Sequence, residues 1–237
     1  MKNNIKIWRL SGRHAFLILL VMVFLCKTMG AIIYLFIALA LLLIFKPKGQ
    51  FMFAAIIAFV VLLYPAIREA ASPQLRGFVE VVAEHNEERS RSLAFRLNNE
   101  NVLLDKANQK KWFGWGSWGR NLIYDDTGKA LSIIDGQWII IFGSWGWVGY
   151  FGFFGLLFFP LLHWFNGLHA SSKYQFNIES YDYSAVLGLI LMANIIDFIP
   201  NSSLSHITLL LAGALAGRVA QLKIKQTHKN SVSSNGL

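Results

Sequence analysis

The residues best suited to chemistry lie between Arg96 and Gly155, where a polar loop rich in arginine and tryptophan runs into a glycine-studded apolar segment. Basic side chains attract anionic groups, and tryptophan rings favour the boundary between a membrane and water. Both kinds of side chain are gathered in one large loop. The pattern predicts a place where a charged, lipid-linked substrate meets the protein.

Two side chains in this loop are spaced to interact. Arg96 and Glu100 stand four residues apart within residues 84–109, a segment rich in helix formers with leucines recurring on one side. Residues four apart meet on the surface of a helix. The pair is either part of a binding site or an ordinary ion pair on a solvated helix, and spacing alone leaves both interpretations open.

The composition defines the class of protein. Of 237 residues, 55% are hydrophobic and 15% are charged, whereas a soluble domain carries about 25% charged residues. Several apolar runs approach the roughly 20 residues that span a bilayer. The net charge of +9 could suggest nucleic-acid binding, but the basic residues flank apolar runs, which is typical of an oriented membrane protein. The single cysteine excludes an intrachain disulfide.

We expect an all-α integral membrane protein with about six transmembrane helices and one large, partly helical periplasmic loop. Lys27 separates the first two apolar runs, and a charge at the bilayer centre costs about 2.5–3.5 kcal/mol, which favours a turn there. One long helix over residues 15–45 is the alternative. The predicted spans are His14–Cys26, Gly30–Phe45, Phe51–Ile67, Trp147–Trp164, Tyr183–Ile199 and Ser205–Leu222. The expected regions are three helices in residues 1–67, the loop in 68–146, three helices in 147–222 and a cytoplasmic tail in 223–237.

Charge sorting predicts the orientation. The loop 68–146 carries ten basic and ten acidic residues, so it is neutral and can be exported. With six spans and a cytoplasmic N-terminus, the other Lys and Arg residues fall on one side of the membrane, Lys27 excepted. This predicts a bacterial inner-membrane protein with both termini in the cytoplasm and the loop in the periplasm. Ile133–Phe142 is too short to cross, so we expect it to enter the interface before the span that begins at Trp147.

Several familiar sites are not supported. Residues 114–119 satisfy G-x-G-x-x-G, but the strand, helix and later acid of a dinucleotide-binding unit do not surround them. Their glycines would instead let the backbone approach a phosphate or bend sharply between interfacial tryptophans. No H-E-x-x-H, C-x-x-C or G-x-S-x-G motif occurs, so neither a metal site nor a serine hydrolase is expected.

Two features of the later spans bear on function. Glycines recur at every third position from Gly143 to Gly155, a spacing that drifts around a helix and favours close approach of several helices or a lipid chain. Asp197 is an acid inside a late span, where ionisable residues are functional candidates. Asn201 and His206 lie near the same bilayer edge and would equally satisfy this carboxylate. Both interpretations of Asp197 stay open.

The motifs follow one another in a recognisable order. A predicted helix carries Arg91 and Arg96, and a glycine-rich turn follows at Phe113–Gly116. Next come an acid at Asp135 and a G-x-x-G span start at Gly146 and Gly149. This order resembles the C-terminal half of the O-antigen ligase/polymerase superfamily of bacterial membrane proteins. The ending Asp197…Asn201…Ala212-Gly213-Ala214 resembles the polymerase-like branch, and Lys27 sits where the family often carries a basic residue at the outer end of a span. The resemblance covers residues 27–217.

Two departures from the family pattern affect the expected activity. Members usually have about ten or more spans, so we expect a truncated or split form that lacks the first half. Asp135-Gly136 replaces the His-Asn pair that ligases use eleven residues before the G-x-x-G. The resemblance therefore favours a polymerase-like transferase or an inactive relative over a ligase.

The resemblance implies glycan transfer from an undecaprenyl diphosphate-linked donor to an acceptor sugar hydroxyl, with no metal or other cofactor. Arginine suits this chemistry because its planar guanidinium binds phosphate oxygens in pairs. Arg96 and Arg91 are the expected catalytic arginines, and Asp135 or Glu100 is the expected base, although Glu100 could equally orient Arg96. The expected substrate-binding residues are Lys27, Lys106, Arg120, Trp112, Trp115, Trp118 and Asp197, with the tryptophans stacking on sugar faces.

Two other classes of protein remain as alternatives. A non-catalytic membrane subunit of a polysaccharide biosynthesis or export complex would tolerate the loss of these side chains and would copurify with other polysaccharide-assembly membrane proteins. A small transporter would place ionisable groups in the middle of the membrane, where only Asp197 comes close.

Overall fold

The computed structural model describes residues 6–7, 10–26, 29–170 and 178–218, and these are helical apart from two short strands and the connecting loops. The expectation of an all-α protein is therefore confirmed. The chain falls into two compact units, Met1–Phe45 and Lys46–Leu237, each of which is described by itself. Lys27 and the predicted tail 223–237 lie outside the described residues.

The first unit contains a helical hairpin. Strands β1 (Lys6–Ile7) and β2 (Leu10–Ser11) pair antiparallel ahead of α1 (Gly12–Leu25), and α2 follows as Met29–Ile44. The rings of Phe24 and Phe36 meet edge to face with centroids 6.4 Å apart, so the end of α1 packs against the middle of α2. Two helices therefore take the place of the single long helix that residues 15–45 could have formed.

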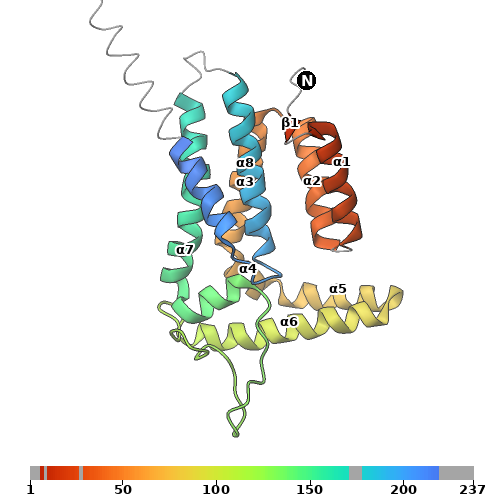
Figure 1. Cartoon of the computed structure of the whole chain (residues 1–237). Helices are drawn as coiled ribbons and strands as arrows, with labels where there is room; N and C mark the ends of the chain where they lie inside the picture. The colour runs from red at the N-terminus through yellow and green to blue at the C-terminus, as the bar shows by residue number, and fades with distance from the viewer. Residues whose placement is uncertain (1–5, 8–9, 27–28, 171–177, 219–237) are drawn as a thin grey trace, which may run out of the picture. The chain divides into compact units, whose positions relative to one another are not determined.

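The second unit is a bundle of four apolar helices, namely α3 (Pro47–Leu62), α7 (Gln137–Ala170), α8 (Ile178–Asp197) and the helix His206–Arg218. Figure 1 shows α3 and α8 running in one direction, with α7 and the last helix running in the other. Ala54 and Ala58 on α3 are buried, and small residues let helices approach closely. On α8, a Cβ added to Gly188 would meet the ring of Phe51 at 3.0 Å, so this ring of α3 packs directly against the α8 backbone.

A bend after α3 redirects the chain towards the loop. Helix α4 (Tyr64–Ala70) makes an angle of 64° with α3. Proline lacks an N–H, so Pro65 cannot donate to the carbonyl oxygen of Val61 as a helix requires. The hydroxyl of Tyr150 on α7 donates to this oxygen instead, at 2.7 Å. The bend is thus satisfied by the neighbouring helix, as a buried backbone carbonyl must be.

The large loop is more helical than the sequence pattern indicated. Helices α5 (Ser72–His85) and α6 (Glu87–Asn108) form an antiparallel pair that lies across the end of the bundle (Figure 1). The side chain of Asn86 caps α6 by accepting from the backbone N–H of Arg89 at 2.9 Å. Segment 84–109 was predicted as helical, and α6 confirms it, whereas α5 was not anticipated.

The turn at Asp125-Asp126-Thr127-Gly128 lies in the rest of the loop. One carboxylate oxygen of Asp125 accepts from the hydroxyl and backbone N–H of Thr127 and from the backbone N–H of Lys129. The hydrogen bond from the Thr127 hydroxyl, and then that from Lys129, lowers the pKa of Asp125 below its ordinary value. Tyr124 and Ala130 pair across this turn as an antiparallel bridge.

The structure supports fewer membrane spans by length than the hydropathy pattern predicts. Among the described residues, Gln137–Leu162 is long and apolar enough to cross a bilayer, and α3 with α4 passes the same test as a bent pair. The other apolar helices, Gly12–Leu25, Gly30–Ile44, Ser184–Asp197 and His206–Arg218, are shorter. One or two candidate spans are therefore shown, and the layout with six remains a prediction.

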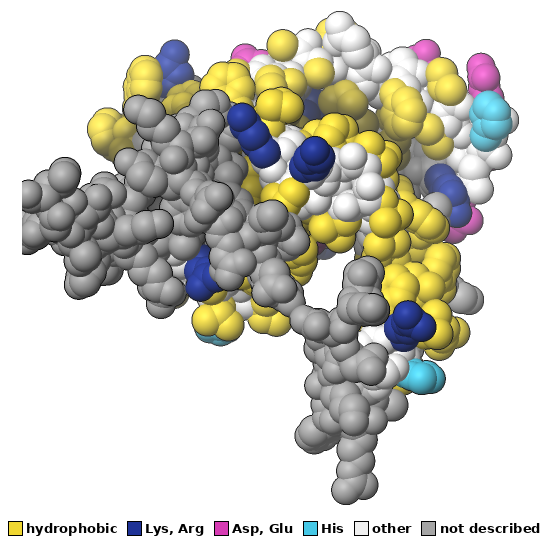
Figure 2. Space-filling model, turned by 90° about the horizontal axis from the view of Figure 1, so that it is seen from above, with side chains coloured by type: hydrophobic (Ala, Val, Ile, Leu, Met, Phe, Trp, Pro, Cys, Tyr) yellow, Lys and Arg dark blue, Asp and Glu magenta, His cyan; other side chains and the backbone are white. Residues whose placement is uncertain are grey.

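The described helices expose much apolar surface. Figure 2 shows hydrophobic side chains over much of the face that it draws. On the second unit, Met52, Phe59, Leu156 and Phe159 are each at least half exposed. Large apolar patches of this kind mark contact with a membrane or with other proteins.

Candidate functional site

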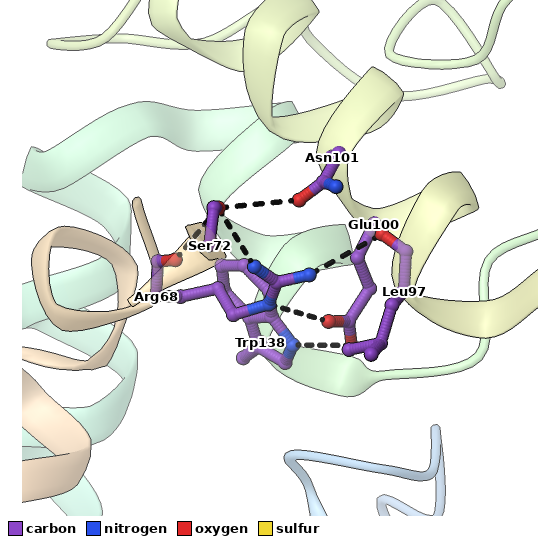
Figure 3. Close-up of polar contacts among 6 residues, drawn as sticks. All are labelled: Arg68, Ser72, Leu97, Glu100, Asn101 and Trp138. Carbon is purple, nitrogen blue, oxygen red and sulfur yellow. Dashed lines mark hydrogen bonds and ion pairs between the residues drawn. The ribbon is translucent and has the colours of Figure 1, made fainter. Parts of the chain in front are cut away.

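A buried arginine organises the junction between the bundle and the loop. Arg68 lies at the end of α4 with only 2% of its surface exposed. Its Nε donates to the Glu100 carboxylate at 3.0 Å, and its two terminal nitrogens donate to the Ser72 hydroxyl at 3.0 Å and the Leu97 carbonyl at 3.2 Å. Figure 3 shows these partners converging on Arg68 from α5 and α6. A buried charge of this kind is tolerated because it is paired and hydrogen-bonded.

Glu100 is held through both of its carboxylate oxygens. One oxygen binds Arg68, and the indole N–H of Trp138 on α7 points to the other at 3.4 Å (Figure 3). Trp138 is fully buried, and its ring meets that of Tyr64 edge to face at 4.9 Å. Glu100 therefore ties α4, α6 and α7 together, and it forms its ion pair with Arg68, where the sequence pattern suggested Arg96.

Arg96 pairs with a residue far along the chain. Its Nε lies 3.7 Å from a carboxylate oxygen of Asp135, and the two side chains are 52% and 35% exposed. This distance is longer than a hydrogen bond, so the guanidinium is only loosely held. Arg96 and Glu100 share one side of α6, which places the accessible Arg96–Asp135 pair beside the buried Arg68–Glu100 pair.

Several contacts position Asp135 against α6. Two residues earlier, the backbone N–H of Ile133 donates to the side-chain oxygen of Asn99 at 3.1 Å. Two residues later, the backbone N–H of Gln137 donates to the carbonyl of Asn201 at 3.1 Å. The segment that carries Asp135 is therefore held between α6 and the turn that follows α8.

Arg91, the second expected catalytic arginine, makes a different contact. It pairs with Glu87 one helical turn away at 2.5 Å, and both side chains are about three-quarters exposed. Exposed pairs of this type contribute little to stability. The structure brings Arg96, Glu100 and Asp135 into one region and gives Arg91 a separate surface partner.

Helix α7 is broken where its span was expected to begin. Gly146 has φ 60° and ψ −161°, outside helical geometry. A continuous helix would bond the N–H groups of Trp147 and Val148 to the carbonyls of Gly143 and Ser144. The kink therefore leaves two N–H donors and two carbonyl acceptors without their helical partners.

The glycine-rich turn and the two residues before it supply all four missing partners. The N–H groups of Trp147 and Val148 donate to the carbonyls of the two residues before the turn, and two N–H groups of the turn donate to the carbonyls of Gly143 and Ser144. The four bonds, 2.7–3.1 Å long, are Trp147 to Lys111, Val148 to Trp112, Trp115 to Gly143 and Gly116 to Ser144. Backbone groups that are shielded from water must be satisfied within the protein.

The glycines of both motifs serve this interlock. A Cβ on Gly114, whose φ is +70°, would overlap the backbone of Ser144, and one on Gly146 would overlap the backbone of Trp112. The close approach that glycine permits is thus between two protein backbones. Within residues 114–119, Gly114 is the glycine that makes such a backbone approach, and the predicted approach to a phosphate stays a prediction.

The three expected sugar-stacking tryptophans have different surroundings. Trp115 donates from its indole N–H to the Lys106 carbonyl at 2.7 Å, and the ammonium of Lys110 lies 4.1 Å from the centre of its ring. Trp112 is 59% exposed and Trp118 is 93% exposed. Trp118 also has φ 67°, an uncommon value for a residue other than glycine. Trp118 is therefore the tryptophan of the three with the most accessible ring.

The remaining expected binding residues are dispersed. The ammonium of Lys106 donates to the Leu122 carbonyl and lies 5.0 Å from the Trp115 ring, so it braces the loop. Arg120 is exposed near Gly116. Lys27 falls outside the described residues. Among the described residues, no group of three or more His, Cys, Asp and Glu is placed to hold a metal ion.

Asp197 is satisfied locally. One carboxylate oxygen accepts from the Asn201 side-chain amide at 2.8 Å and the other from the Ser203 hydroxyl at 2.7 Å. These contacts shape the turn after α8, in which Phe198 and Asn201 accept hydrogen bonds from the start of α7. Of the two interpretations of Asp197, this geometry favours the structural one.

Comparison with known proteins decides the family. A model of the O-antigen ligase family matches residues 14–159, which is more than half of the chain. The protein belongs to the O-antigen ligase family. Neither curated proteins nor solved structures gave a match. Membership implies a membrane protein and glycan transfer of the ligase or polymerase kind, with a lipid-linked glycan as substrate.

The region matched to the O-antigen ligase family contains the whole junction described above. It includes Arg68, Arg96, Glu100 and Asp135 and ends within α7, ahead of Asp197. Arg68 was missed as a site residue because it was counted among the ordinary charges of the loop. A signal was present, since Arg68 directly follows the apolar run 51–67, which was predicted to be a span.

Proposed function

We propose that this O-antigen ligase family protein transfers a glycan from an undecaprenyl diphosphate-linked donor to an acceptor sugar hydroxyl, at the Arg96–Asp135 pair. The observation that carries the proposal is this pair itself. It joins residues 39 positions apart, it is accessible, and it lies beside a buried framework that holds α6 against the bundle. The six-span layout, with the loop in the periplasm, forms part of the proposal.

The pair provides complementary groups for such a transfer. The bond from the sugar anomeric carbon to the diphosphate oxygen breaks, and a bond from that carbon to the acceptor oxygen forms. Negative charge develops on the departing diphosphate, where the terminal nitrogens of Arg96 can bind two oxygens at once. The carboxylate of Asp135 accepts the proton of the acceptor hydroxyl.

The proposal gives the neighbouring residues supporting roles. Glu100 acts as a positioning residue, because Arg68 and Trp138 already occupy its two oxygens. Trp118 is the tryptophan that we assign to stacking on a sugar face, since its ring is 93% exposed. Arg96 stabilises the negative charge of the diphosphate, and Arg120 is a further exposed cation of the loop.

Replacement of Arg96 tests the proposal. We expect Arg96→Ala to lower glycan-chain assembly about a hundredfold or more, as removal of a charge-stabilising donor commonly does. Asp135→Asn should lower it as well, because the amide cannot accept the proton. The measurement is the glycan ladder on a gel in cells that depend on this protein, with the membrane-inserted amount determined alongside.

Arg89→Ala is the matched control, since Arg89 is an exposed arginine on the same helix whose side chain forms no ion pair or hydrogen bond with the described residues. It should leave the ladder unchanged. Normal ladders with both Arg96→Ala and Asp135→Asn would overturn the catalytic assignment and would point to a non-catalytic subunit of a polysaccharide-assembly complex.

A further inference from the structure

An exposed aromatic and basic patch surrounds the α7 kink, and the transfer reaction gives it no role. Trp112, just before the glycine-rich turn, and Phe113, its first residue, are 59% and 76% exposed. Lys110 and Lys111 directly precede them and are exposed as well. We call these four residues the collar. Exposed aromatic side chains next to cations need a partner with both apolar and anionic character.

The collar is fixed to α7 at its kink. The carbonyls of Lys111 and Trp112 accept the first two N–H groups beyond the kink, those of Trp147 and Val148. The collar therefore cannot move along α7 without breaking backbone hydrogen bonds. Gly114 and Gly146 are held by the same interlock, with no space for a side chain on either.

The apolar part of the collar continues onto the outer surface of α7. Val148, whose N–H binds the Trp112 carbonyl, is 54% exposed, and Trp145 and Phe151 are 46% and 45% exposed. These residues belong to Gln137–Leu162, the described helix that is long enough to cross a bilayer. Gly146 breaks this helix beside the collar. Aromatic rings at a membrane–water boundary lie at the depth of lipid headgroups, and nearby lysines reach the phosphates.

We infer that the collar binds anionic phospholipid headgroups of the leaflet at this end of the bundle. Trp112 and Phe113 insert among the upper acyl chains, and Lys110 and Lys111 bind the phosphates. The docked collar holds the kink, and with it the residues that lead from Asp135 into α7, at a constant depth. The inference uses the membrane character of the family and does not depend on the proposed transfer reaction.

Site-specific quenching tests this inference. Single cysteines replace Phe113, Trp112 or Asp126 in a full-length chain carrying Cys26→Ser, and each is labelled with an environment-sensitive fluorophore after reconstitution into liposomes that contain phosphatidylglycerol. Asp126 is the control because it is exposed in the turn at 125–128. Nitroxide groups near the headgroups should quench the labels at 112 and 113 by about twofold or more and leave the label at 126 unaffected. Phe113→Cys is the decisive variant, since a side chain 76% exposed has little packing to lose.

Retention of lipid tests the role of the lysines. The double variant Lys110→Gln, Lys111→Gln should retain phosphatidylglycerol roughly fivefold more weakly per lysine in native mass spectrometry, with phosphatidylcholine unaffected. Equal quenching at positions 113 and 126, or unchanged lipid retention, would overturn the inference. Labels shielded from solvent in detergent but not quenched by lipid nitroxides would assign the collar to a protein partner and would also overturn it. If the unsubstituted protein shows no glycan transfer while the labels are quenched as expected, the result supports the collar and counts against the proposed transfer reaction alone.

Discussion

At the scale of single residues, partner choice decides which side chains are available for chemistry. Arg68 and Arg96 are chemically identical, yet one is buried with three polar partners around it and the other faces solvent with one loosely held carboxylate. The buried arginine is committed to structure, because every release of a partner would expose a charge to an apolar environment. The accessible arginine is the one that can bind a ligand.

Replacement of Arg68 should therefore affect stability. Arg68→Ala leaves the Glu100 carboxylate buried beside Trp138 without its cation, which should lower the free energy of unfolding by about 3–5 kcal/mol. The measurement is thermal or chemical unfolding in detergent. The double variant Arg68→Met, Glu100→Gln should recover much of this loss, because it removes both charges. A double variant no more stable than Arg68→Ala would contradict the assignment.

At the scale of elements, both breaks in the apolar helices are repaired by a neighbouring segment. The bend before α4 is satisfied by the hydroxyl of Tyr150, and the kink in α7 is satisfied by the backbone of the glycine-rich turn and the two residues before it. Each break redirects the chain at the end of the bundle where α6 lies (Figure 1). The breaks are therefore what positions the candidate site against the apolar helices.

Tyr150→Phe tests whether the Tyr150 hydroxyl stabilises the bend between α3 and α4. The change leaves the buried Val61 carbonyl without its donor, which should destabilise the protein by about 1–3 kcal/mol. Pro65→Ala in the same chain restores an N–H that can bond to Val61 and should reverse part of the loss. Unfolding measurements on the single and double variants check this. Additive destabilisation by the two changes would argue against the repair.

The interlock at the second break makes a sharper prediction. Gly146→Ala adds a Cβ at φ +60° that would overlap the Trp112 backbone, and overpacking together with backbone strain should cost about 2–4 kcal/mol. Gly152→Ala is the control on the same helix, because its Cβ would meet nothing within 4 Å. The folded yield after purification and the unfolding midpoint report the difference. Equal behaviour of the two alanine variants would contradict the interlock.

At the scale of the whole molecule, the directions of the helices place the large loop and the turn after α8 at the same end of the bundle. Helices α3 and α8 both run towards α6 (Figure 1), and the turn after α8 bonds to the start of α7. The length test identifies only one or two of the described helices as spans. The proposed periplasmic reaction therefore depends on which side of the membrane the loop 68–146 faces.

Cysteine labelling in intact cells tests sidedness. In a chain with Cys26→Ser, a cysteine at Asp126 should react with a membrane-impermeant maleimide, whereas a cysteine at Lys48, beside the start of α3, should react only after permeabilisation. Reaction of both positions only after permeabilisation would place the Arg96–Asp135 pair in the cytoplasm. That result would remove the proposed access to an exported lipid-linked donor.

Local patterns were sufficient for some of these features. The helix formers in residues 84–109 predicted α6, because periodicity and composition act through nearby residues. The candidate span begins at Gln137, earlier than the predicted start at Trp147, and the kink at Gly146 marks the predicted position. The spacing between Asp135 and the G-x-x-G identified an acid that does lie beside Arg96. Helix α5 was missed although Ser72–His85 has an amphipathic helical pattern and a proline in its first turn, which are local signals for a helix.

The sequence by itself determined the membrane class, the family and the short list of arginines and acids, since these depend on composition and on motif order along the chain. Tertiary structure alone decided which acid each arginine meets and what the glycines approach. The physical reason is that any arginine can pair with any acid and any backbone N–H can bond to any carbonyl, so the sequence offers many equivalent partners. Only the packing of α4, α6 and the kinked α7 brings particular partners within reach.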